Sequence, residues 1–316
     1  MTTVQNNPKG ILLILIGMAV FSIQDALIKF IYEDSALYEL YLGRTLAALF
    51  FLFCYMKFSN QKIILKTYYP FLTIFRIILF FFGFSFFYIS LTYMSLAMAN
   101  ALFFSSPFFV SILAIIFLKE KVGIRRWSAI LMGFIGVFIV LNPNFNDFDY
   151  MKLAPIACAL CYAASMTITK YTSQKDSSYT QMLHLYFGAT IISILFFIFT
   201  GDGQFNNFED PTFQFIFREW FSNPTYAWPI IILMGFIGAF AFYCIFNAYS
   251  IASPSVVSLY EYSLIIWSIL IGYALFDNIP TLRTFIGVSI IIGAGIYIYF
   301  REKVKDQMIA TDTPNR

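Results

Sequence analysis

The feature that most constrains this 316-residue sequence is that one half repeats the other. Residues 87–97 read FYISLTYMSLA, and residues 242–252 read FYCIFNAYSIA, an offset of 242 − 87 = 155 positions. LKEKVGIRRWSAILMGFIGV at 118–137 is answered by LFDNIPTLRTFIGVSIIIGA at 275–294, an offset of 275 − 118 = 157. The fold must therefore accommodate two diverged copies of one unit.

The unit is apolar. Hydrophobic residues make up 60% of the chain and charged residues 12%, which leaves too little polar surface to cover a soluble globule. Most of the apolar runs approach the ~20 residues that cross a bilayer as a helix, and they lack the alternation of a membrane β-barrel. We predict an all-α membrane protein with ten transmembrane helices, at about 10–31, 37–56, 70–93, 98–118, 124–141, 152–171, 179–199, 227–249, 254–275 and 281–300.

Each half holds five of these segments. An odd number of crossings places the two copies in opposite orientations, so the sequence predicts a first repeat at 10–141 and an inverted second repeat at 152–300, with short tails at 1–9 and 301–316. Inverted repeats of this kind build many secondary transporters, whose substrate site lies near the bilayer midplane between the repeats.

The charges in the loops predict the orientation. With a cytoplasmic N-terminus, the inner loops and tails carry fourteen basic residues and the outer loops only three, Lys152, Arg218 and Arg283. This bias follows the positive-inside rule, so we expect both termini in the cytoplasm of a bacterial cell, with the chain in its inner membrane. The net charge of +3 is accounted for by topology and gives no reason to expect nucleic acid as a partner. The longest outer loop, about 201–226, either covers the outer mouth or is a solvated connector.

The cysteines and the single histidine exclude several chemistries. Cys54, Cys158, Cys161 and Cys244 all fall inside predicted spans, and the Cys-x-x-Cys pair has no ligand partner except His184, in another span. Buried thiols behave as small hydrophobes. We therefore expect no metal, no cofactor and no catalytic residues, and we do not expect the protein to be an enzyme.

Charged residues inside membrane spans are expensive and mark candidate functional sites. Ser22 and Asp25 share one stripe of the first span, and Glu261 lies about 10 Å deep in the ninth span at 1.5 Å per residue from Pro254. A carboxylate at that depth is paired, protonated or in contact with water. Glu261 is thus either a binding or coupling acid, or a structural partner of an arginine.

Two arginines lie in the second and third spans. Arg44 and Arg76 each offer a planar guanidinium suited to a carboxylate or phosphate. Each is either a contact for an anionic substrate group or a counter-charge for Asp25 or Glu261.

Uncharged polar side chains complete the candidate site. Tyr88 and Tyr243 are equivalent positions of the two repeats. Separately, we expect Pro107 to kink the fourth span. Aromatic rings over a cavity bind cations and flat rings, and amides orient polar substrates. The further candidates for substrate binding are Tyr88, Asn100, Tyr243, Asn247 and Tyr260.

The arrangement resembles the drug/metabolite transporter superfamily and its EamA branch. The strongest stretch is YEYSLIIWSILIGYALFDNIPTLRTFIGVSIIIGAGIYIYFRE at 260–302, and ALFFSSPFFVSILAIIFLKEKVGIRRW at 101–127 is its counterpart in the first half. Glu120 and Asp277 occupy the acidic position that follows the fourth helix of such a repeat. IQDALIKF with the downstream ELYLGR resembles the bacterial subgroup that includes S-adenosylmethionine and riboflavin uptake carriers.

This resemblance implies a central cavity and its lining. It supports five lining residues: Asp25, Tyr88, Asn100, Asn247 and Glu261. The sixth span departs from the pattern, because Met166 stands where the first span has its acid. The two halves are therefore expected to be chemically unequal.

We expect a secondary carrier that moves a small organic metabolite, amino-acid-derived, nucleoside-like or vitamin-like, by alternating access, with uptake as the favoured direction. No nucleotide-binding G-x-x-x-x-G-K-[ST] loop is present, so protons or a counter-substrate must supply the energy. The alternatives are an exporter of amino acids or toxic compounds with the same fold, and a membrane protein without transport activity. The sequence leaves a monomer and a homodimer open.

Overall fold

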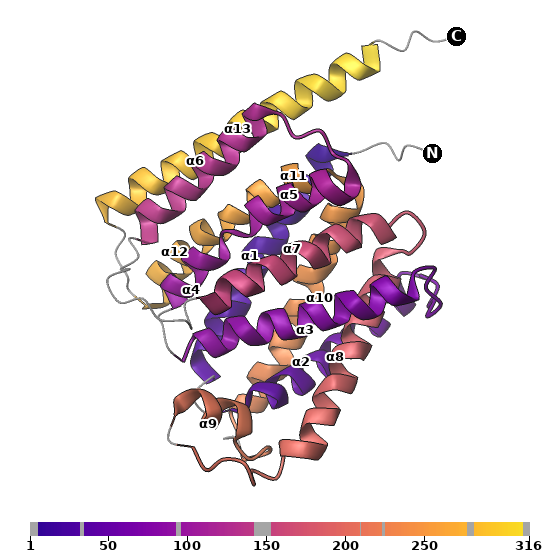
Figure 1. Cartoon of the computed structure of the whole chain (residues 1–316), viewed down its shortest axis with the longest axis vertical. Helices are drawn as coiled ribbons and strands as arrows, with labels where there is room; N and C mark the ends of the chain where they lie inside the picture. The colour runs from indigo at the N-terminus through magenta and orange to yellow at the C-terminus, as the bar shows by residue number, and fades with distance from the viewer. Residues whose placement is uncertain are drawn as a thin grey trace.

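The computed structural model describes residues 6–31, 35–92, 96–141, 153–208, 210–222, 225–276 and 281–311, and these residues contain helices and no strands (Figure 1). The first half forms α1 (Asn7–Ile31), α2 (Leu37–Phe58), α3 (Pro70–Ser90), α4 (Leu96–Phe103), α5 (Ser106–Leu118) and α6 (Ile124–Leu141). The second half forms α7 (Ala154–Thr172), α8 (Ser178–Thr200), α9 (Pro211–Phe217), α10 (Ala227–Ile251), α11 (Pro254–Val257), the 3₁₀ helix η2 (Ser258–Tyr262), α12 (Ser263–Phe276) and α13 (Leu282–Thr311).

Helical structure coincides with every apolar segment predicted from the sequence. Seven stretches are long and apolar enough to cross a membrane, at 7–28, 37–58, 70–90, 178–200, 227–251, 254–271 and 282–300. The helices α5, α6 and α7 fall outside that set; α5 is an apolar helix of 13 residues, and α7 ends with the polar sequence Thr-Lys-Tyr-Thr. The chain is thus a multi-pass membrane protein, and the count of ten spans remains a prediction.

The fourth and ninth predicted spans are both interrupted. The fourth divides into α4 and α5 at Phe104–Ser105, and Pro107 lies at the start of α5, as expected for a proline that cannot continue a helix. The ninth divides into α11 and α12, with the 3₁₀ helix η2 between them. Adding the repeat offset of 155 to positions 104–105 gives 259–260, which lie inside η2. The two interruptions are therefore equivalent positions of the two sequence repeats.

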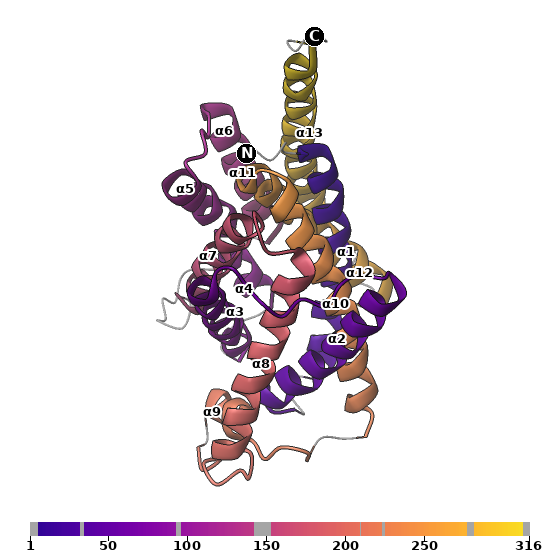
Figure 2. The same cartoon turned by 90° about the vertical axis from the view of Figure 1, so that its right-hand side faces the viewer.

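Helices of the two halves interlock. α1 packs along α10, α3 along α7, and α6 along α13, and each of these pairs joins one half to the other (Figures 1 and 2). The α6–α13 pair is very close, because a Cβ atom added to Gly136 would lie 2.8 Å from the carbonyl oxygen of Gly287. By contrast, nothing lies within 4 Å of the corresponding point on Gly293 of α13.

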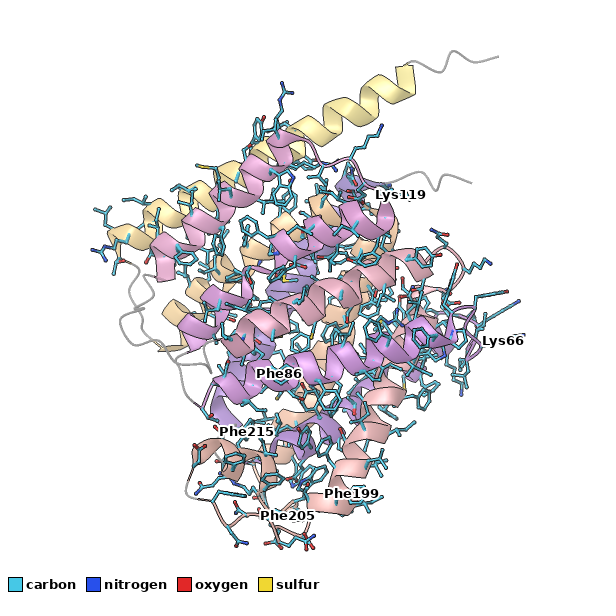
Figure 3. The ribbon with its side chains drawn as sticks, in the orientation of Figure 1. Lys66, Phe86, Lys119, Phe199, Phe205 and Phe215 are labelled. Carbon is cyan, nitrogen blue, oxygen red and sulfur yellow. The ribbon has the colours of Figure 1, made fainter. Side chains whose placement is uncertain are left out.

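α13 is longer than its apolar segment. The helix continues through Thr311, beyond the predicted span end at 300, because Arg-Glu-Lys-Val-Lys-Asp-Gln is a run of mostly good helix formers. The end of α13 and the start of α1 lie at the same end of the molecule (Figures 1 and 2). We call this the terminal end, and Lys66 and Lys119 also lie toward it (Figure 3). Phe205 and Phe215 lie toward the opposite end, near α9.

Candidate functional site

The first polar cluster in the interior is built around Arg44 of α2. Arg44 is 7% exposed and donates a hydrogen bond from Nη1 to the Tyr88 hydroxyl at 3.0 Å. Its guanidinium also lies 5.3 Å from the centre of the Tyr41 ring, within the range of a cation–π contact. The arginine is therefore fixed by α2 and α3 and surrounded by aromatic rings.

Asp25 of α1 completes this cluster. Its carboxylate interacts electrostatically with Arg44 and with Tyr88, and its side chain is only half-buried. Among the described residues, no hydrogen bond or short ion pair to the carboxylate is formed. The structure thus brings together three residues predicted from the sequence, and we call Asp25, Tyr41, Arg44 and Tyr88 the Arg44 cluster.

A small cavity adjoins the Arg44 cluster. Its volume is about 20 Å³, which is room for about one water molecule and not for a metabolite. The lining comes from α1, α2, α3, α9 and α10: Ile28, Leu40, Tyr41, Arg44, Tyr88, Leu91, Phe215 and Met234. Any larger ligand at this place requires a rearrangement of the surrounding helices.

α9 and its flanking segments form the cover of this cavity. Phe215 of α9 is 5% exposed and points into the lining, and Trp220 is buried as well. Thr212 is joined to Thr92 by a hydroxyl hydrogen bond of 2.6 Å, and the Phe221 amide donates to Glu39 of α2 at 3.2 Å. Of the two roles considered for the 201–226 loop, its described part fits the cover.

The second polar cluster surrounds Glu261, which lies in η2 and is 2% exposed. Tyr249 of α10 and Tyr162 of α7 both donate hydroxyl hydrogen bonds to Oε1, at 2.6 and 2.7 Å. Ser106 of α5 donates to Oε2 at 3.4 Å. We call these three donors the hydroxyl cradle. Ser106 is also the repeat equivalent of Glu261, since the two positions differ by 155.

Glu261 does not pair with either arginine. Its hydrogen bonds among the described residues are the three from hydroxyl groups, and no lysine, arginine or histidine there interacts with it. The sequence had left open a structural ion pair with Arg44 or Arg76, and the geometry of the described residues gives neither. Arg44 instead faces Tyr88 and Asp25.

Arg76 is buried in a separate network near the terminal end. Its guanidinium donates to the side-chain oxygen and to the backbone carbonyl of Gln181, and more weakly to the hydroxyls of Thr169 and Thr172. Phe246 lies under the guanidinium at 5.6 Å. These contacts join α3, α7 and α8, so Arg76 stands apart from both clusters described above.

Asn247 and Tyr243 also lie away from the Arg44 cluster. Asn247 accepts a hydrogen bond from Ser178 at 3.0 Å, and Tyr243 accepts one from Tyr179 at 3.3 Å. Both partners lie at the start of α8. Tyr243 also borders a cavity of about 100 Å³ between α2 and α10. Tyr88 and its repeat equivalent Tyr243 therefore occupy different surroundings.

Three remaining candidates contact neighbouring backbone. The Tyr260 hydroxyl donates to the Gly295 carbonyl at 2.7 Å, and the Ser22 hydroxyl donates to the Ala19 carbonyl at 2.7 Å. The Asn100 carbonyl accepts from the Phe104 amide at the α4–α5 interruption. Asp277 lies outside the described residues.

The terminal end is closed by a third polar cluster, which we call the terminal seal. Glu120, after α5, accepts hydrogen bonds of 2.8 Å from the hydroxyls of Ser253 and Ser255, and Arg126 donates to Ser255 at 3.0 Å. Lys170 of α7 donates to a backbone carbonyl of α10 at 2.9 Å. The seal joins the first half to the start of α11.

Sequence reasoning missed the hydroxyl partners of Glu261, Tyr162 and Tyr249, and the ring of Tyr41 beside Arg44. A buried tyrosine hydroxyl needs a hydrogen-bond partner, so tyrosines in the middle of a span are natural partners for a lone carboxylate. That signal is present at Tyr162 and Tyr249, but it does not say which of the chain's 21 tyrosines faces Glu261. Among the described residues, no group of three His, Cys, Asp or Glu side chains is placed to hold a metal.

Comparison with known families explains the repeated architecture. The model of the EamA-like transporter family matches residues 8–142 and again 151–301. The chain belongs to the EamA-like transporter family. Members of this family are transporters, which agrees with the EamA resemblance inferred from the sequence and with a multi-pass membrane protein. The likeness covers both halves, including all the helices that carry the Arg44 cluster and the hydroxyl cradle.

Two of the relatives are named for the small metabolites that they transport. The S-adenosylmethionine uptake transporter of Rickettsia prowazekii is 26% identical over 294 residues, 93% of each chain. The riboflavin transporter of Vibrio cholerae is 30% identical over 192 residues, 61% of this chain and 58% of its own. A solved crystal structure of a protein shares the fold, with a TM-score of 0.72 at 15% identity, covering 90% of this chain and 95% of that one.

Proposed function

We propose that this protein is a secondary carrier of the bacterial inner membrane that takes up a small organic metabolite by alternating access. The observation that carries the proposal is the Arg44 cluster: a buried arginine and a carboxylate, from different helices, surrounded by tyrosines beside a cavity. In a member of a transporter family, such a charge pair is a ready binding site for a ligand that carries both signs of charge.

The cluster favours an amino-acid-derived substrate that carries a flat ring. Arg44 offers two-pronged hydrogen bonds to a carboxylate, Asp25 attracts an ammonium group, and the rings of Tyr41 and Tyr88 suit an aromatic or cationic group. S-adenosylmethionine has all three features, and an uptake carrier for it is among the relatives. Riboflavin is the cargo named for another relative. It has a flat ring for the tyrosines but no amino-acid group for Arg44 and Asp25.

Alternating access requires one end to close while the other opens. The terminal seal closes one end of the described structure, and α9 covers the cavity from the other. Of the remaining site candidates, Arg76, Asn100, Tyr243, Asn247 and Tyr260 lie on helices that must move for a metabolite to pass. We assign them to the supporting framework of the path, with Ser22 beside the Arg44 cluster.

Uptake into proteoliposomes tests the proposal. Purified protein, reconstituted with an inward proton gradient, should accumulate radiolabelled S-adenosylmethionine faster than protein-free vesicles do, and faster than it accumulates riboflavin. The proposal would be refuted if vesicles with and without the protein took up each of the two probes at the same rate. The rival function, export of amino acids, predicts instead that preloaded vesicles lose amino acids when the gradient is applied from the opposite side.

Orientation is part of the same proposal. The basic residues at the terminal end, among them Lys66 and Lys119, support a cytoplasmic location for both termini. Reporter fusions after Arg316 and within the 201–226 loop should report opposite sides of the membrane. A reporter that reads the same side in both fusions would contradict the topology.

A further inference from the structure

We infer that Glu261 is the proton carrier of the transport cycle, with the proton bound at Oε2, and that its protonation loosens η2 from α7 and α10. The inference rests on the proposed transport function and adds its energy source. It separates the roles of the two intramembrane acids: Asp25 binds the ligand, and Glu261 carries the proton.

The hydrogen bonds around Glu261 are asymmetric, and this asymmetry identifies the atom that takes the proton. Oε1 accepts two short bonds, from Tyr249 at 2.6 Å and Tyr162 at 2.7 Å. Oε2 has a single long contact, 3.4 Å, with the Ser106 hydroxyl. The two phenols can keep donating to Oε1 when the acid is neutral, because Oε1 is then a carbonyl oxygen. The Ser106 hydroxyl makes only a long contact and can turn to accept, so a proton on Oε2 finds a partner in Ser106.

The groups that face Glu261 are hydroxyl groups, whereas in an ion pair the carboxylate would face a cation. The titratable groups that face Glu261 are Tyr162 of α7, Tyr249 of α10 and Tyr262 of its own element. In the described part of the chain, α1, α5, α6 and α13 contribute no charged side chain to its interactions. A permanently charged carboxylate this deeply buried would be costly without a cation, whereas one that exchanges a proton is charged only in part of the cycle.

Glu261 is also separate from the ligand site. It interacts neither with Asp25 nor with Arg44, and its cradle is closed by side chains of α5, α7 and α10. Proton and metabolite therefore have different binding places in this protein. Coupling between them must run through the movement of the helices that carry both sites.

The proton step balances as a simple transfer. A proton from water on one side binds the Glu261 carboxylate at Oε2, the new O–H donates to Ser106, and no other group changes its charge. The two phenol bonds to Oε1 then join neutral groups and lose about half their strength. Release of the same proton to water on the other side restores the carboxylate and the strong bonds. One proton crosses per cycle.

The backbone around Glu261 suits this movement. A 3₁₀ stretch in the middle of a helix commonly marks a hinge, and Glu261 lies within η2, between α11 and α12. Ser106, which faces it, begins α5 directly after the equivalent interruption in the first half. The proton site thus lies where the two interrupted spans meet, and a change in its bonds acts on both.

Glu261→Gln tests the inference with little disturbance of shape. The glutamine oxygen accepts from both tyrosines, and its amide donates to Ser106, as the protonated acid would. In proteoliposomes with an inward proton gradient, the variant should lose at least tenfold in accumulation of S-adenosylmethionine. It should retain measurable exchange of labelled for unlabelled S-adenosylmethionine, at a rate that no longer depends on pH. Gradient-driven accumulation at the wild-type level would overturn the inference.

Glu219→Gln is the matched control. It makes the same chemical change at an exposed carboxylate beyond α9, and it should accumulate S-adenosylmethionine like the wild type. One outcome is that the wild type transports this probe while its exchange rate depends on pH in the same way as that of Glu261→Gln. In that case the assignment of the proton site is wrong, and the proposed function stands. If the wild type transports neither S-adenosylmethionine nor riboflavin, the proposed function fails and the proton site is decided by spectroscopy.

Infrared difference spectroscopy on the purified full-length protein supplies that measurement without any substrate. Raising the pH should remove a carboxylic-acid C=O band from the wild type, from Glu219→Gln and from Asp25→Asn, and the same band should be missing in Glu261→Gln at every pH. A band that persists unchanged in Glu261→Gln, or a wild type without a pH-dependent band, would overturn the inference.

Discussion

Asp25 and Glu261, the acids of the two clusters, have opposite surroundings. Asp25 is half-buried and faces a fixed arginine that itself lines a cavity, whereas Glu261 is fully enclosed and faces only hydroxyl groups among the described residues. A charge opposite a counter-charge beside open space is arranged for a ligand, which can compete for both partners. A charge held by neutral hydroxyl donors is arranged for a proton, because the acid can take up and release the proton without a permanent counter-charge beside it. The difference between the sites therefore indicates a division of labour.

The strongest test of this division is the loss of one partner in the Arg44 cluster. Arg44→Gln removes the charge that would bind a substrate carboxylate and leaves Asp25 without its counter-charge. We expect uptake to fall roughly 100-fold or more, equivalent to about 2.7 kcal/mol. Exchange should fall equally, because binding itself is lost. Parallel uptake and exchange assays in proteoliposomes measure both, and a variant that loses uptake but keeps exchange would assign Arg44 to coupling.

A smaller effect is expected when the hydroxyl cradle loses one donor. Tyr249→Phe removes a single hydrogen bond of 2.6 Å to Glu261 and keeps the ring. A hydrogen bond to a charged group contributes about 1.5–3 kcal/mol, of which only part differs between the two protonation states. We expect gradient-driven uptake to slow by about three- to tenfold, with exchange reduced less than uptake. Tyr297→Phe, at an exposed tyrosine of α13, is the matched control and should change neither rate.

Opening the terminal seal should shift the balance between conformations. Ser253→Ala with Ser255→Ala removes both hydroxyl donors to Glu120. Loss of about 1 kcal/mol favours the state open at the terminal end by roughly fivefold. In a background lacking the four native cysteines, a thiol introduced by Ser250→Cys should then react faster with a water-soluble reagent. Unchanged labelling would show that the seal does not hold this end closed.

A purely structural defect should leave both sites intact. Gly136→Ala would push a methyl group against the Gly287 backbone, whereas Gly293→Ala meets nothing within 4 Å. We expect Gly136→Ala to lower stability by about 1–3 kcal/mol and Gly293→Ala by less than about 0.5 kcal/mol. The pH dependence of uptake by the surviving protein should match the wild type in both variants. Thermal unfolding in detergent and transport assays would separate these outcomes.

The helices were predictable because the membrane makes their signal strong. Long apolar runs placed every predicted span on helical structure, and Pro107 correctly indicated the interruption of the fourth span. The interruption at η2 was not predicted, since Ser-Leu-Tyr-Glu-Tyr contains no proline or glycine. The repeat itself carried that information, because the equivalent of Phe104–Ser105 falls inside η2.

The partners of the polar residues were much harder to predict. Asp25, Arg44 and Glu261 stood out because charge is rare in a span, but their pairing depends on how each helix is rotated. In a membrane protein, lipid-facing and protein-facing sides are both apolar, so periodicity does not fix that rotation. Asn247 and Tyr243 were candidates for substrate binding, yet both contact the start of α8. The sequence therefore predicted which charged residues are important, but only the packing of the helices shows which of them contact one another.

The absence of a cation beside Glu261, among the residues described, has an electrical consequence. Asp25 and Arg44 stay with the protein and cancel. S-adenosylmethionine carries a net charge of +1, from one carboxylate, one ammonium and one sulfonium group, so each cycle with one proton moves two elementary charges. The membrane voltage then drives accumulation directly. At about 2.3 kcal/mol per elementary charge for each 100 mV, a voltage of about 100 mV alone would sustain a roughly 2,000-fold concentration ratio across the membrane. Uptake should therefore generate a measurable inward current, carried by the proton and the cationic substrate together.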